Sequence, residues 1–418
     1  MTYDEAYKKL SEEGQLHILK YYNDLTVEEQ EDLLDQISLT DFSLLSALTK
    51  KRGVSSKKGH IEPLSALELE DIRKNASIFI QAGSEAIRSG KVGAVLLAGG
   101  MGTRLGSEDP KGMYNIGLTK EVYIFQRLFE NLMDVIHQVS IQGQMQWVHL
   151  FIMTSDKNHA KTVRFLKEKS YFGYHPDYIH FFRQEMAPAT DYNGKIYMEA
   201  PGKIASSPNG NGGWYSSMAR AGLVDVITEN GIEWLNVFGV DNVLQRICDP
   251  CFIGAVMQNK CSSGSKVVRK ANPDERVGVM CLEDGKPSIV EYYELNDEMR
   301  NAKNEKGDPA YNFGVILNYL FDVKSLNVIL AQKLDQKLEL HVVEKKINHI
   351  DEDGNLVKPD APNGCKFETL ILDMVHLMDG CLPYEVVREY EFAPIKNLTG
   401  VDSVDTAREL CLKNKIEL

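Results

Sequence analysis

The sequence predicts an α/β protein with a mixed sheet flanked by helices, a helical N-terminal region and a shortened C-terminal region. Three observations support this class. Between residues 90 and 240, short apolar runs alternate with helix-like stretches. After residue 265 the apolar runs follow one another closely, which indicates antiparallel neighbours. Before residue 90, apolar residues recur at helical spacing.

Residues 1–90 are expected to form the N-terminal helical region. Thr26 and Glu29 fit a capping box ahead of apolar residues at helical spacing, and Ser65 and Glu68 fit a second one. The basic segment 50–60 lies between them, and we expect it to be a solvated loop.

Residues 91–397 carry the alternating pattern and are expected to form the central domain. Their first strands are expected at 92–97, 147–153, 178–182 and 234–240. Because these runs are apolar on both faces, they predict a buried parallel sheet. Helices are expected at 121–137, 214–230 and 365–378, and further strands at 266–270, 277–282 and 288–295. Residues 398–418 are expected to form a short C-terminal helical tail, with its helix at 403–413.

Composition excludes several classes of partner. The net charge of −13 opposes binding to nucleic acid or to anionic membranes. No stretch of about 18 apolar residues predicts a membrane span, and the charged N-terminus does not resemble a signal peptide. Seven cysteines are an odd and sparse set, which favours reduced thiols and a cytoplasmic location.

Cys248 and Cys251 form a C-x-x-C segment that could indicate a zinc or redox site. A structural zinc site would need a second close pair, whereas Cys261 and Cys281 are far apart in the sequence. Reduced structural thiols are therefore the favoured interpretation.

The most informative segment follows the first strand and runs from Leu97 to Lys111. Its glycines allow the backbone to turn sharply and to approach a ligand. Backbone N–H groups of such a loop, with the N-terminus of the helix expected after it, suit phosphate oxygens. Arg104 and Lys111 add two positive charges. The alternative is a plain glycine turn, which the two cations make a poorer interpretation.

Two common phosphate loops do not fit this segment. A dinucleotide-binding fingerprint needs a glycine three residues after Gly102, but Leu105 stands there. A P-loop needs Gly-Lys-Ser/Thr, whereas Lys111 follows Pro110 and precedes Gly112. A nicotinamide-dependent dehydrogenase and a P-loop kinase are therefore disfavoured.

The pattern G-G-x-G-T-R-L-G-x-x-x-P-K over residues 99–111 resembles the signature of the sugar-nucleotide pyrophosphorylases. It is most similar to that of the eukaryotic UDP-N-acetylhexosamine pyrophosphorylases. Similar segments recur between about residues 90 and 400, including Pro208–Tyr215, Val240–Asn242 and Pro394–Asn397. The resemblance implies a Rossmann-like nucleotidyltransferase fold with its catalytic domain at 91–397.

The resemblance also implies a reaction. UTP and N-acetylglucosamine 1-phosphate would give UDP-N-acetylglucosamine and pyrophosphate, with Mg²⁺ as cofactor and Mn²⁺ as a second option. The alternatives are a UDP-glucose or UDP-galactose type of pyrophosphorylase, and a nucleotide-sugar-binding protein without catalysis. We expect a monomer.

Several residue roles follow from the resemblance. Arg104, Lys111 and Lys396 are the implied catalytic residues. Asp241 follows the expected strand 234–240, at a sheet edge where ligands gather, and is the implied magnesium ligand. Further implied substrate-binding residues are Leu97, Gly99, Gly100, Gly102 and Thr103 for the phosphates, Gln184, Gly210 and Asn211 for the uridine, and Glu291, Tyr292 and Asn312 for the sugar.

The chain departs from the family pattern at the expected sugar site. Val315 stands where relatives carry an asparagine that contacts the sugar, and Leu370 and Leu372 stand where relatives carry aromatic residues. These changes leave the preferred sugar open. Relatives also continue into a C-terminal β domain, whereas this sequence ends soon after Lys396.

Overall fold

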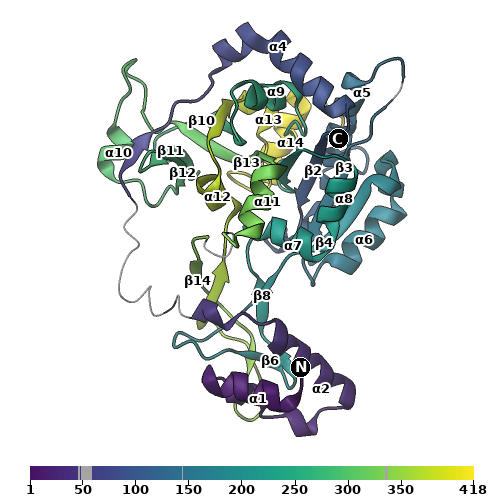
Figure 1. Ribbon diagram of the computed structural model, residues 1–418, viewed down its shortest axis with the longest axis vertical. Helices are drawn as coiled ribbons and strands as arrows, with labels where there is room; N and C mark the ends of the chain where they lie inside the picture. Colours follow the sequence, from purple (N-terminus) through teal and green to yellow (C-terminus); the bar gives the residue numbers. More distant parts are fainter. Residues whose placement is uncertain (46–47, 49–58, 144, 335–337) are drawn as a thin grey trace. The chain divides into compact units, whose positions relative to one another are not determined.

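A computed structural model describes residues 1–45, 48, 59–143, 145–334 and 338–418, so most of the basic segment 50–60 lies outside the described residues. The chain forms two compact units (Figure 1). The first unit comprises Met1–Lys57, Gln184–Gly213 and Lys337–Ile371, and the second comprises Lys58–Arg183, Trp214–Gln336 and Leu372–Leu418. The expected domain boundaries after residues 90 and 397 stay predictions.

The second unit is built on the predicted mixed sheet, whose main path runs β1-β11-β13-β9-β2-β3-β4. Four neighbouring strands are parallel: β2 (Val92–Leu97), β3 (His149–Thr154), β4 (Ile179–Arg183) and β9 (Trp234–Gly239). Leu97 is in register with Met153 and with Gly239, so the carboxyl ends of three strands reach one edge. Ligand-binding loops of open α/β sheets start at such an edge.

The remaining strands complete the mixed sheet. Strand β13 (Phe313–Asp322) runs antiparallel to β9, and β10 pairs antiparallel with β13 and parallel with β18. The other bounds are β1 (Ile61–Pro63), β10 (Ser263–Arg269), β11 (Val279–Glu283), β12 (Lys286–Val290) and β18 (Cys381–Glu385).

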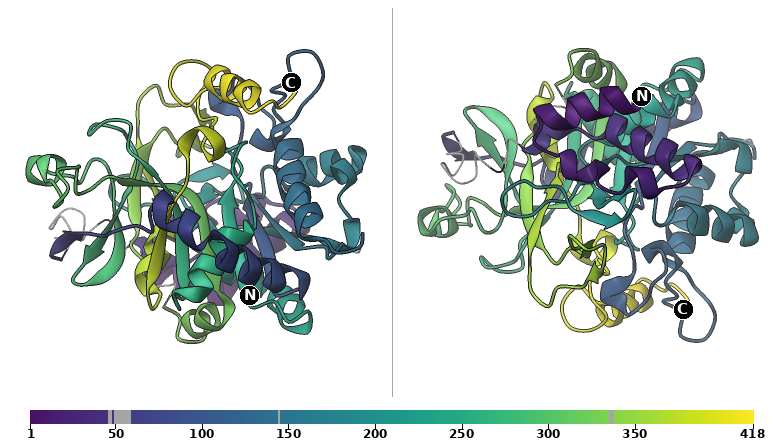
Figure 2. Two further views of the ribbon diagram at one scale, coloured as in Figure 1. Left: turned by 90° about the horizontal axis from the view of Figure 1, so that it is seen from above. Right: turned by 90° about the horizontal axis from the view of Figure 1, so that it is seen from below.

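Helices lie on both sides of this sheet (Figure 2). The longest are α4 (Leu69–Arg88) and α5 (Ile124–Val139), and α5 buries Phe125, Leu128 and Phe129 in the main core. Each such side chain contributes about 1.5–3 kcal/mol by leaving water. Further helices are α6 (His159–Glu168), α7 (Trp214–Arg220), α8 (Leu223–Glu229), α9 (Pro250–Gln258), α10 (Asp297–Asn301), α11 (Val323–Ala331), α13 (Arg388–Glu391) and α14 (Val404–Lys413).

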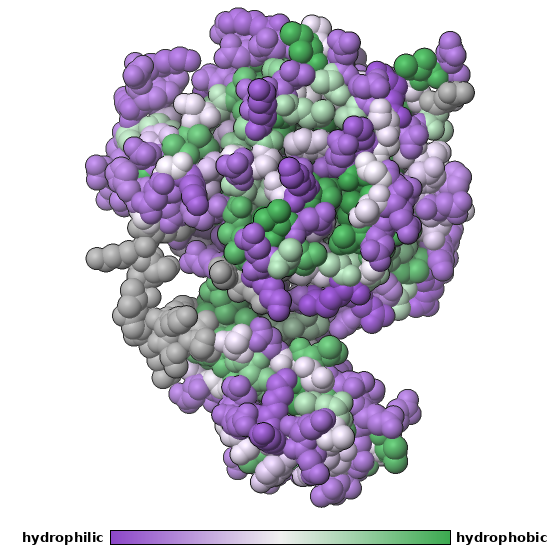
Figure 3. All heavy atoms as spheres, viewed as in Figure 1, coloured by the Kyte–Doolittle hydropathy of each residue, from purple (hydrophilic) through white to green (hydrophobic). Residues whose placement is uncertain are grey.

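In the residues that the structure describes, the first unit combines the helices α1 and α2 with short two-stranded sheets. Hydrophilic residues cover most of the displayed α1 and α2 region (Figure 3), whereas Leu10, Leu33 and Ile37 form a small core with Ile196. The bounds are α1 (Tyr3–Glu12), α2 (Val27–Leu39), β5 (Met186–Pro188), β6 (Met198–Ala200), β7 (Lys203–Ile204), β8 (Ser206–Pro208), β14 (His341–Lys345), β15 (His349–Ile350), β16 (Leu356–Val357) and β17 (Gly364–Glu368).

The two expected capping boxes have different outcomes. The one at Thr26 and Glu29 is confirmed at the start of α2. The one at Ser65 is wrong, because α4 begins at Leu69 and Glu68 caps it without a side-chain bond. The preceding Leu67 pairs instead with strand β18, donating its N–H to Pro383 O at 2.8 Å. Non-local strand pairing therefore overrides the local helix signal.

Two expected helices also need correction. The stretch 214–230 forms α7 and α8, because Gly222 takes a left-handed φ of 73° between them. The stretch 365–378 starts as strand β17, which pairs with β14, and continues as the short helix α12 (Ile371–Met374). The expected terminal helix is confirmed as α14.

The C-x-x-C segment has a structural explanation. Asp249 between its cysteines caps α9 by accepting a hydrogen bond from Cys251 N at 3.1 Å. Burial raises the pKa of the Cys248 thiol far above its ordinary value and raises the pKa of Cys251 as well. Both are free, protonated thiols at neutral pH. Among the described residues, no helix combines the length and the apolarity that a membrane crossing requires.

Candidate active site

The glycine-rich loop leaves β2 at the buried Leu97 and folds back on itself. Gly102 N donates to Asp109 O at 2.8 Å, and Lys111 N donates to Gly100 O at 3.2 Å. These bonds bring Lys111 beside Gly100 at the start of the loop, although Lys111 comes 11 positions later in the sequence. The N–H groups of Gly102 and Lys111 are therefore used within the loop.

Two short 3-10 turns, Thr103–Leu105 and Lys111–Met113, follow the loop, and α5 begins at Ile124, whose N–H donates to Tyr114 O at 3.1 Å. The expected contribution of a helix N-terminus to phosphate binding stays a prediction. Thr103 and Arg104 are exposed, and Gly99 is half-buried.

Asn158 supports the loop from a distant part of the chain. Its buried side-chain amide donates to Ala98 O at 2.9 Å and to Gly100 O at 3.3 Å, and accepts from Ser155 N at 2.8 Å. These bonds fix two carbonyl groups of the loop. Sequence reasoning missed Asn158, and its position three residues after Ser155 is the only signal that could have suggested it.

Three charged side chains act on the ammonium group of Lys111. Burial lowers the pKa of its ammonium group, the Asp241 carboxylate opposes that change, and the positive charges of Arg104 and Lys396 add to it. The next residue, Gly112, packs against Phe125 so closely that a Cβ atom would lie 2.3 Å from the ring. The structure thus brings together the four charged residues that the sequence selected, and α5 anchors the segment that bears Lys111.

Asp241 is held at the same sheet edge. It follows β9, and the neighbouring Val240 donates its N–H to Leu97 O at 3.2 Å. The half-buried carboxylate folds back over Gly239, where a Cβ atom would lie 2.9 Å from Oδ1. One half-buried carboxylate fits a Mg²⁺ ion that takes most of its ligands from substrate phosphates and water.

Lys396 approaches from the C-terminal segment. The preceding Ile395 donates its N–H to Asp241 O at 2.8 Å, so the backbone joins the two site segments. The Lys396 ammonium group pairs with Asp402 at 2.9 Å. Both side chains are about one-third exposed, so a bound anion could compete with Asp402.

The expected uridine residues gather at one end of the two-stranded sheet β5-β8 in the first unit. Strand β5 begins just after the buried Gln184, and its partner β8 ends just before Gly210. Gly210 has a φ of 76° and lies against Thr369, where a Cβ atom would be 2.2 Å from the carbonyl oxygen. Only glycine fits there. Asn211 accepts a hydrogen bond from Ile371 N at 2.9 Å.

The expected sugar residues lie in the second unit. Glu291 and Val315 flank Gly278: a Cβ atom on that glycine would lie 3.5 Å from Glu291 Oε1 and 3.5 Å from Val315 Cγ2. Tyr292 is exposed in the turn that follows β12, and Asn312 precedes β13. The structure therefore places the substituted Val315 beside the implied sugar carboxylate. Leu372 belongs to this unit, whereas Leu370 belongs to the first.

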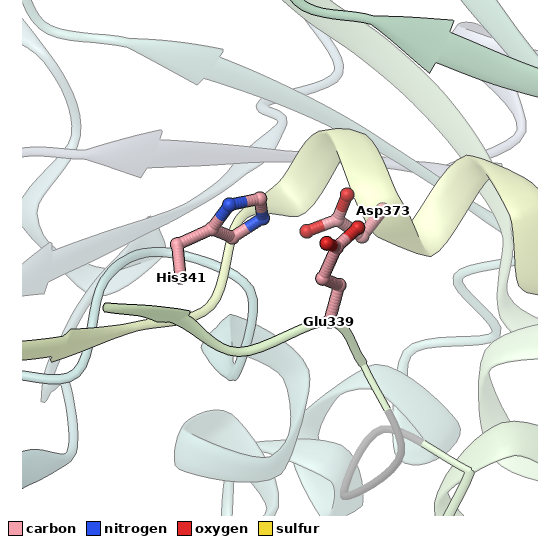
Figure 4. Close-up of side chains that lie close together, drawn as sticks. All are labelled: Glu339, His341 and Asp373. Atoms are coloured by element: carbon pink, nitrogen blue, oxygen red, sulfur yellow. The ribbon is translucent and has the colours of Figure 1, made fainter. Parts of the chain in front are cut away.

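Three other side chains are of a metal-binding type and are labelled in Figure 4. Glu339 and His341, at the start of β14, belong to the first unit, whereas Asp373 on α12 belongs to the second. Because they come from different units, we assign no metal site to them.

Sequence comparison places the chain among known proteins. The model of the family described as UTP–glucose-1-phosphate uridylyltransferase matches residues 42–406. The protein named UDP-N-acetylhexosamine pyrophosphorylase-like protein 1 of Mus musculus is 35% identical, over 93% of this chain and 79% of the relative. The UDP-N-acetylglucosamine pyrophosphorylase of Saccharomyces cerevisiae is 35% identical, over 96% of this chain and 88% of the relative.

Structural comparison gives the same fold. The crystal structure of the uridine diphosphate N-acetylglucosamine pyrophosphorylase from Trypanosoma brucei, in complex with an inhibitor, has a TM-score of 0.83 and 27% identity. The match covers 98% of this chain and 84% of that one. A UDP-glucose phosphorylase of the same organism has a TM-score of 0.67 at 17% identity, over 90% of this chain and 75% of that one, and supports the fold alone.

Proposed function

Because this chain belongs to the UTP–glucose-1-phosphate uridylyltransferase family, we propose that it joins UTP to N-acetylglucosamine 1-phosphate, giving UDP-N-acetylglucosamine and pyrophosphate. Relatives named as UDP-N-acetylglucosamine pyrophosphorylases or diphosphorylases support this choice of sugar. Three of them are 32–35% identical over 96–99% of this chain.

The observation that carries the proposal is the group of charges around Lys111. Three cations and one carboxylate lie close enough for Arg104, Asp241 and Lys396 each to influence the pKa of Lys111. In a protein of net charge −13, such a local positive site selects anionic ligands. A triphosphate and a sugar phosphate are the anions that the family membership implies.

The reaction is a direct displacement. A phosphate oxygen of the sugar 1-phosphate attacks the α-phosphorus of UTP, the bond to the bridging oxygen breaks, and pyrophosphate leaves with the electron pair. No covalent protein intermediate is required, because the nucleophile is already an anion. The protein therefore contributes orientation and electrostatic support for the leaving charge.

Each charged residue has a part in this reaction. Arg104 and the loop residues Leu97, Gly99, Gly100 and Thr103 hold the β- and γ-phosphates, and Gly102, whose N–H is bonded to Asp109 O, leaves room for them by lacking a side chain. Lys111 bridges the α-phosphate and the leaving oxygen. Lys396 exchanges Asp402 for the phosphate of the sugar. Close to the reacting atoms, these cations reduce the repulsion between two polyanions.

Asp241 is the proposed ligand of Mg²⁺, for which Mn²⁺ can substitute. The ion, when bound, neutralises phosphate charge and polarises the phosphorus centre. Asp241 is suited to hold it because the carboxylate is half-buried at the sheet edge beside Lys111. The resident charge of Asp241 also keeps the site from being purely cationic.

The remaining residues select the two substrates. Gln184 can both donate to and accept from the edge of uracil, and Gly210 and Asn211 are assigned to the uridine with it. Glu291 accepts hydrogen bonds from sugar hydroxyl groups, with Tyr292 and Asn312 as its neighbours in the assignment.

Glucose 1-phosphate is the second candidate substrate, because Val315 beside Glu291 removes an amide from the sugar site. The test is pyrophosphate release from UTP and Mg²⁺ with a panel of sugar 1-phosphates. We expect the highest kcat/KM with N-acetylglucosamine 1-phosphate. A preference for glucose 1-phosphate would contradict the choice of sugar, and UTP binding without pyrophosphate release would indicate a non-catalytic protein.

A cytoplasmic monomer is the proposed form. The seven cysteines, all of them in the part of the chain that the structure describes, form no disulfide, which suits a reducing compartment. Light scattering of the purified protein tests the monomer, and fluorescence imaging of a tagged chain tests the location.

A further inference from the structure

Asn242 joins the two chain segments that bear Asp241 and Lys396. Its side-chain Nδ2 donates to Glu391 O at 2.7 Å, and its Oδ1 accepts from Ala393 N at 2.9 Å and from Leu244 N at 3.3 Å. The residue is only 3% exposed. The Asn242 side chain thus makes two hydrogen bonds to the C-terminal segment before Lys396 and one hydrogen bond within its own turn.

The backbone follows the same pairing. The turn after β9 and the segment before Lys396 run antiparallel, with a bridge between Asn242 and Pro394. Ile395 N donates to Asp241 O at 2.8 Å, and Val243 N donates to Ala393 O at 3.4 Å. Lys396 follows directly after Ile395. The spacing between the Asp241 and Lys396 backbones is therefore set at Asn242.

A second buried amide, that of Gln245, supports the turn after β9. Gln245 Nε2 donates to Gly239 O at 2.7 Å and to Asn242 O at 2.9 Å. Its Oε1 accepts from Asn318 Nδ2 at 3.2 Å, and Asn318 Oδ1 accepts from Asn236 Nδ2 at 2.8 Å. Burial of so many amides is costly unless every one is paired, so a satisfied network of this kind holds one arrangement.

We infer that Asn242 is a positioning residue, which fixes the metal-ligand carboxylate of Asp241 relative to the ammonium group of Lys396. The inference rests on the proposed function of those two residues. Asparagine suits the position because one short side chain must donate to a carbonyl and accept from two N–H groups. Aspartate cannot donate to Glu391 O, and glutamine is one methylene longer.

The test is a double-mutant cycle on the full chain with Asn242→Asp and Lys396→Ala, measured as kcat for pyrophosphate release. Asn242→Asp keeps both accepted hydrogen bonds and loses the donated one. It therefore tests the positioning role of Asn242 even where Asn242→Ala does not fold. We expect it to lower kcat about 10–100-fold, as for other residues that orient a metal ligand. In the Lys396→Ala background the further loss should be several-fold smaller than in the wild type, because one of the two groups that Asn242 positions is already absent.

A purely structural role predicts a different result. The losses of kcat from the two substitutions would then multiply, so that Asn242→Asp would lower kcat by the same factor with and without Lys396, and this result would overturn the inference. An Asn242→Asp protein within about threefold of the wild-type kcat would overturn it as well. Asn131→Ala is the matched control. Asn131 on α5 donates to Val243 O and Gln245 O, both at 3.1 Å, but has no bond to the segment before Lys396. It should lower thermal stability and leave kcat within about threefold.

Assays of the wild-type chain separate a failure of the proposed function from a failure of the positioning role of Asn242. If the wild-type chain releases no pyrophosphate, the proposed function is contradicted. The positioning role would still be tested by calorimetric titration of the same variants with Mg²⁺ and UTP, in which Asn242→Asp should weaken binding about tenfold more than Asn131→Ala. Equal affinities of these two variants would overturn the positioning role.

Discussion

The carboxylate of Asp241 folds back over Gly239, so that Oδ1 lies 2.9 Å from the position a Cβ atom of that glycine would take. Leu317 Cδ2 lies 3.3 Å from the same position. A methyl group at residue 239 therefore has no room unless the carboxylate or the leucine moves. Gly239 keeps the proposed metal ligand in place by lacking a side chain.

Gly239→Ala should therefore displace the Asp241 carboxylate and lower kcat about 10–100-fold. Asp241→Ala should cost more, about 10²–10³-fold, because the charge itself is removed. Extra Mg²⁺ should restore part of the activity of Gly239→Ala but not that of Asp241→Ala. Turnover assays over a range of Mg²⁺ concentrations measure both effects. A fully active Gly239→Ala protein would show that catalysis does not depend on the exact position of the Asp241 carboxylate.

Lys111→Met should lower kcat about 10²–10³-fold and raise thermal stability at neutral pH. Burial lowers the pKa of Lys111 in the folded protein, so the unfolded chain binds that proton more tightly. The wild-type free energy of unfolding should then increase as pH rises from the folded pKa to the unfolded pKa of about 10.4.

Denaturant unfolding of both proteins between pH 7 and pH 10.5 measures this difference. The stability advantage of Lys111→Met should shrink as pH rises. If the difference in the free energy of unfolding stays constant or grows with pH, the positive charge of Lys111 does not destabilise the folded protein.

His180→Phe should make the second unit more resistant to acid. His180 Nε2 lies 2.9 Å from His149 Nδ1, and burial followed by the charge of His149 lowers the pKa of His180 to about 4. The unfolded chain therefore takes up the proton first, and wild-type stability falls between pH 6.5 and about pH 4. One such proton contributes at most about 1.4 kcal/mol per pH unit.

The difference in the free energy of unfolding between the variant and the wild type should grow as pH falls through that range. His137→Phe, at an exposed position on α5, is the control and should show no such trend. A flat difference for His180→Phe would contradict the prediction.

Val315→Asn should restore an amide beside Glu291 and raise the kcat/KM for N-acetylglucosamine 1-phosphate about 3–10-fold relative to glucose 1-phosphate, the effect of one hydrogen bond. Val315→Leu adds bulk without a polar group and should not change the ratio in this direction. Steady-state kinetics with both sugar 1-phosphates measure this ratio. An equal change with both variants would show that volume, not hydrogen bonding, sets the preference.

Much of the sheet could be predicted from local sequence. The run Val92–Leu97 is apolar throughout and ends in glycines, and it forms β2 with those bounds. The start of α4 could not be predicted this way, because Leu67 pairs with a strand more than 300 residues further along the chain. The break within 214–230 could not be predicted either, because the left-handed backbone of Gly222 interrupts an otherwise continuous helical pattern.

The site divides in the same way. A local motif indicates Arg104 and Lys111, and the position after a strand indicates Asp241. Only the resemblance indicates Lys396, since nothing in its local sequence predicts a phosphate contact. The supporting amides of Asn158, Asn242 and Gln245 were not predicted to act, because their partners are set by the folded backbone.

The bonds from Asn158 to Ala98 and Gly100 limit what the glycine motif can do by itself. Residues 97–111 take their conformation partly from an amide about 60 positions away. Transplanting that peptide into an unrelated scaffold would copy its letters but not its shape. Pattern searches that score the peptide alone will therefore also find chains in which the same letters adopt another conformation.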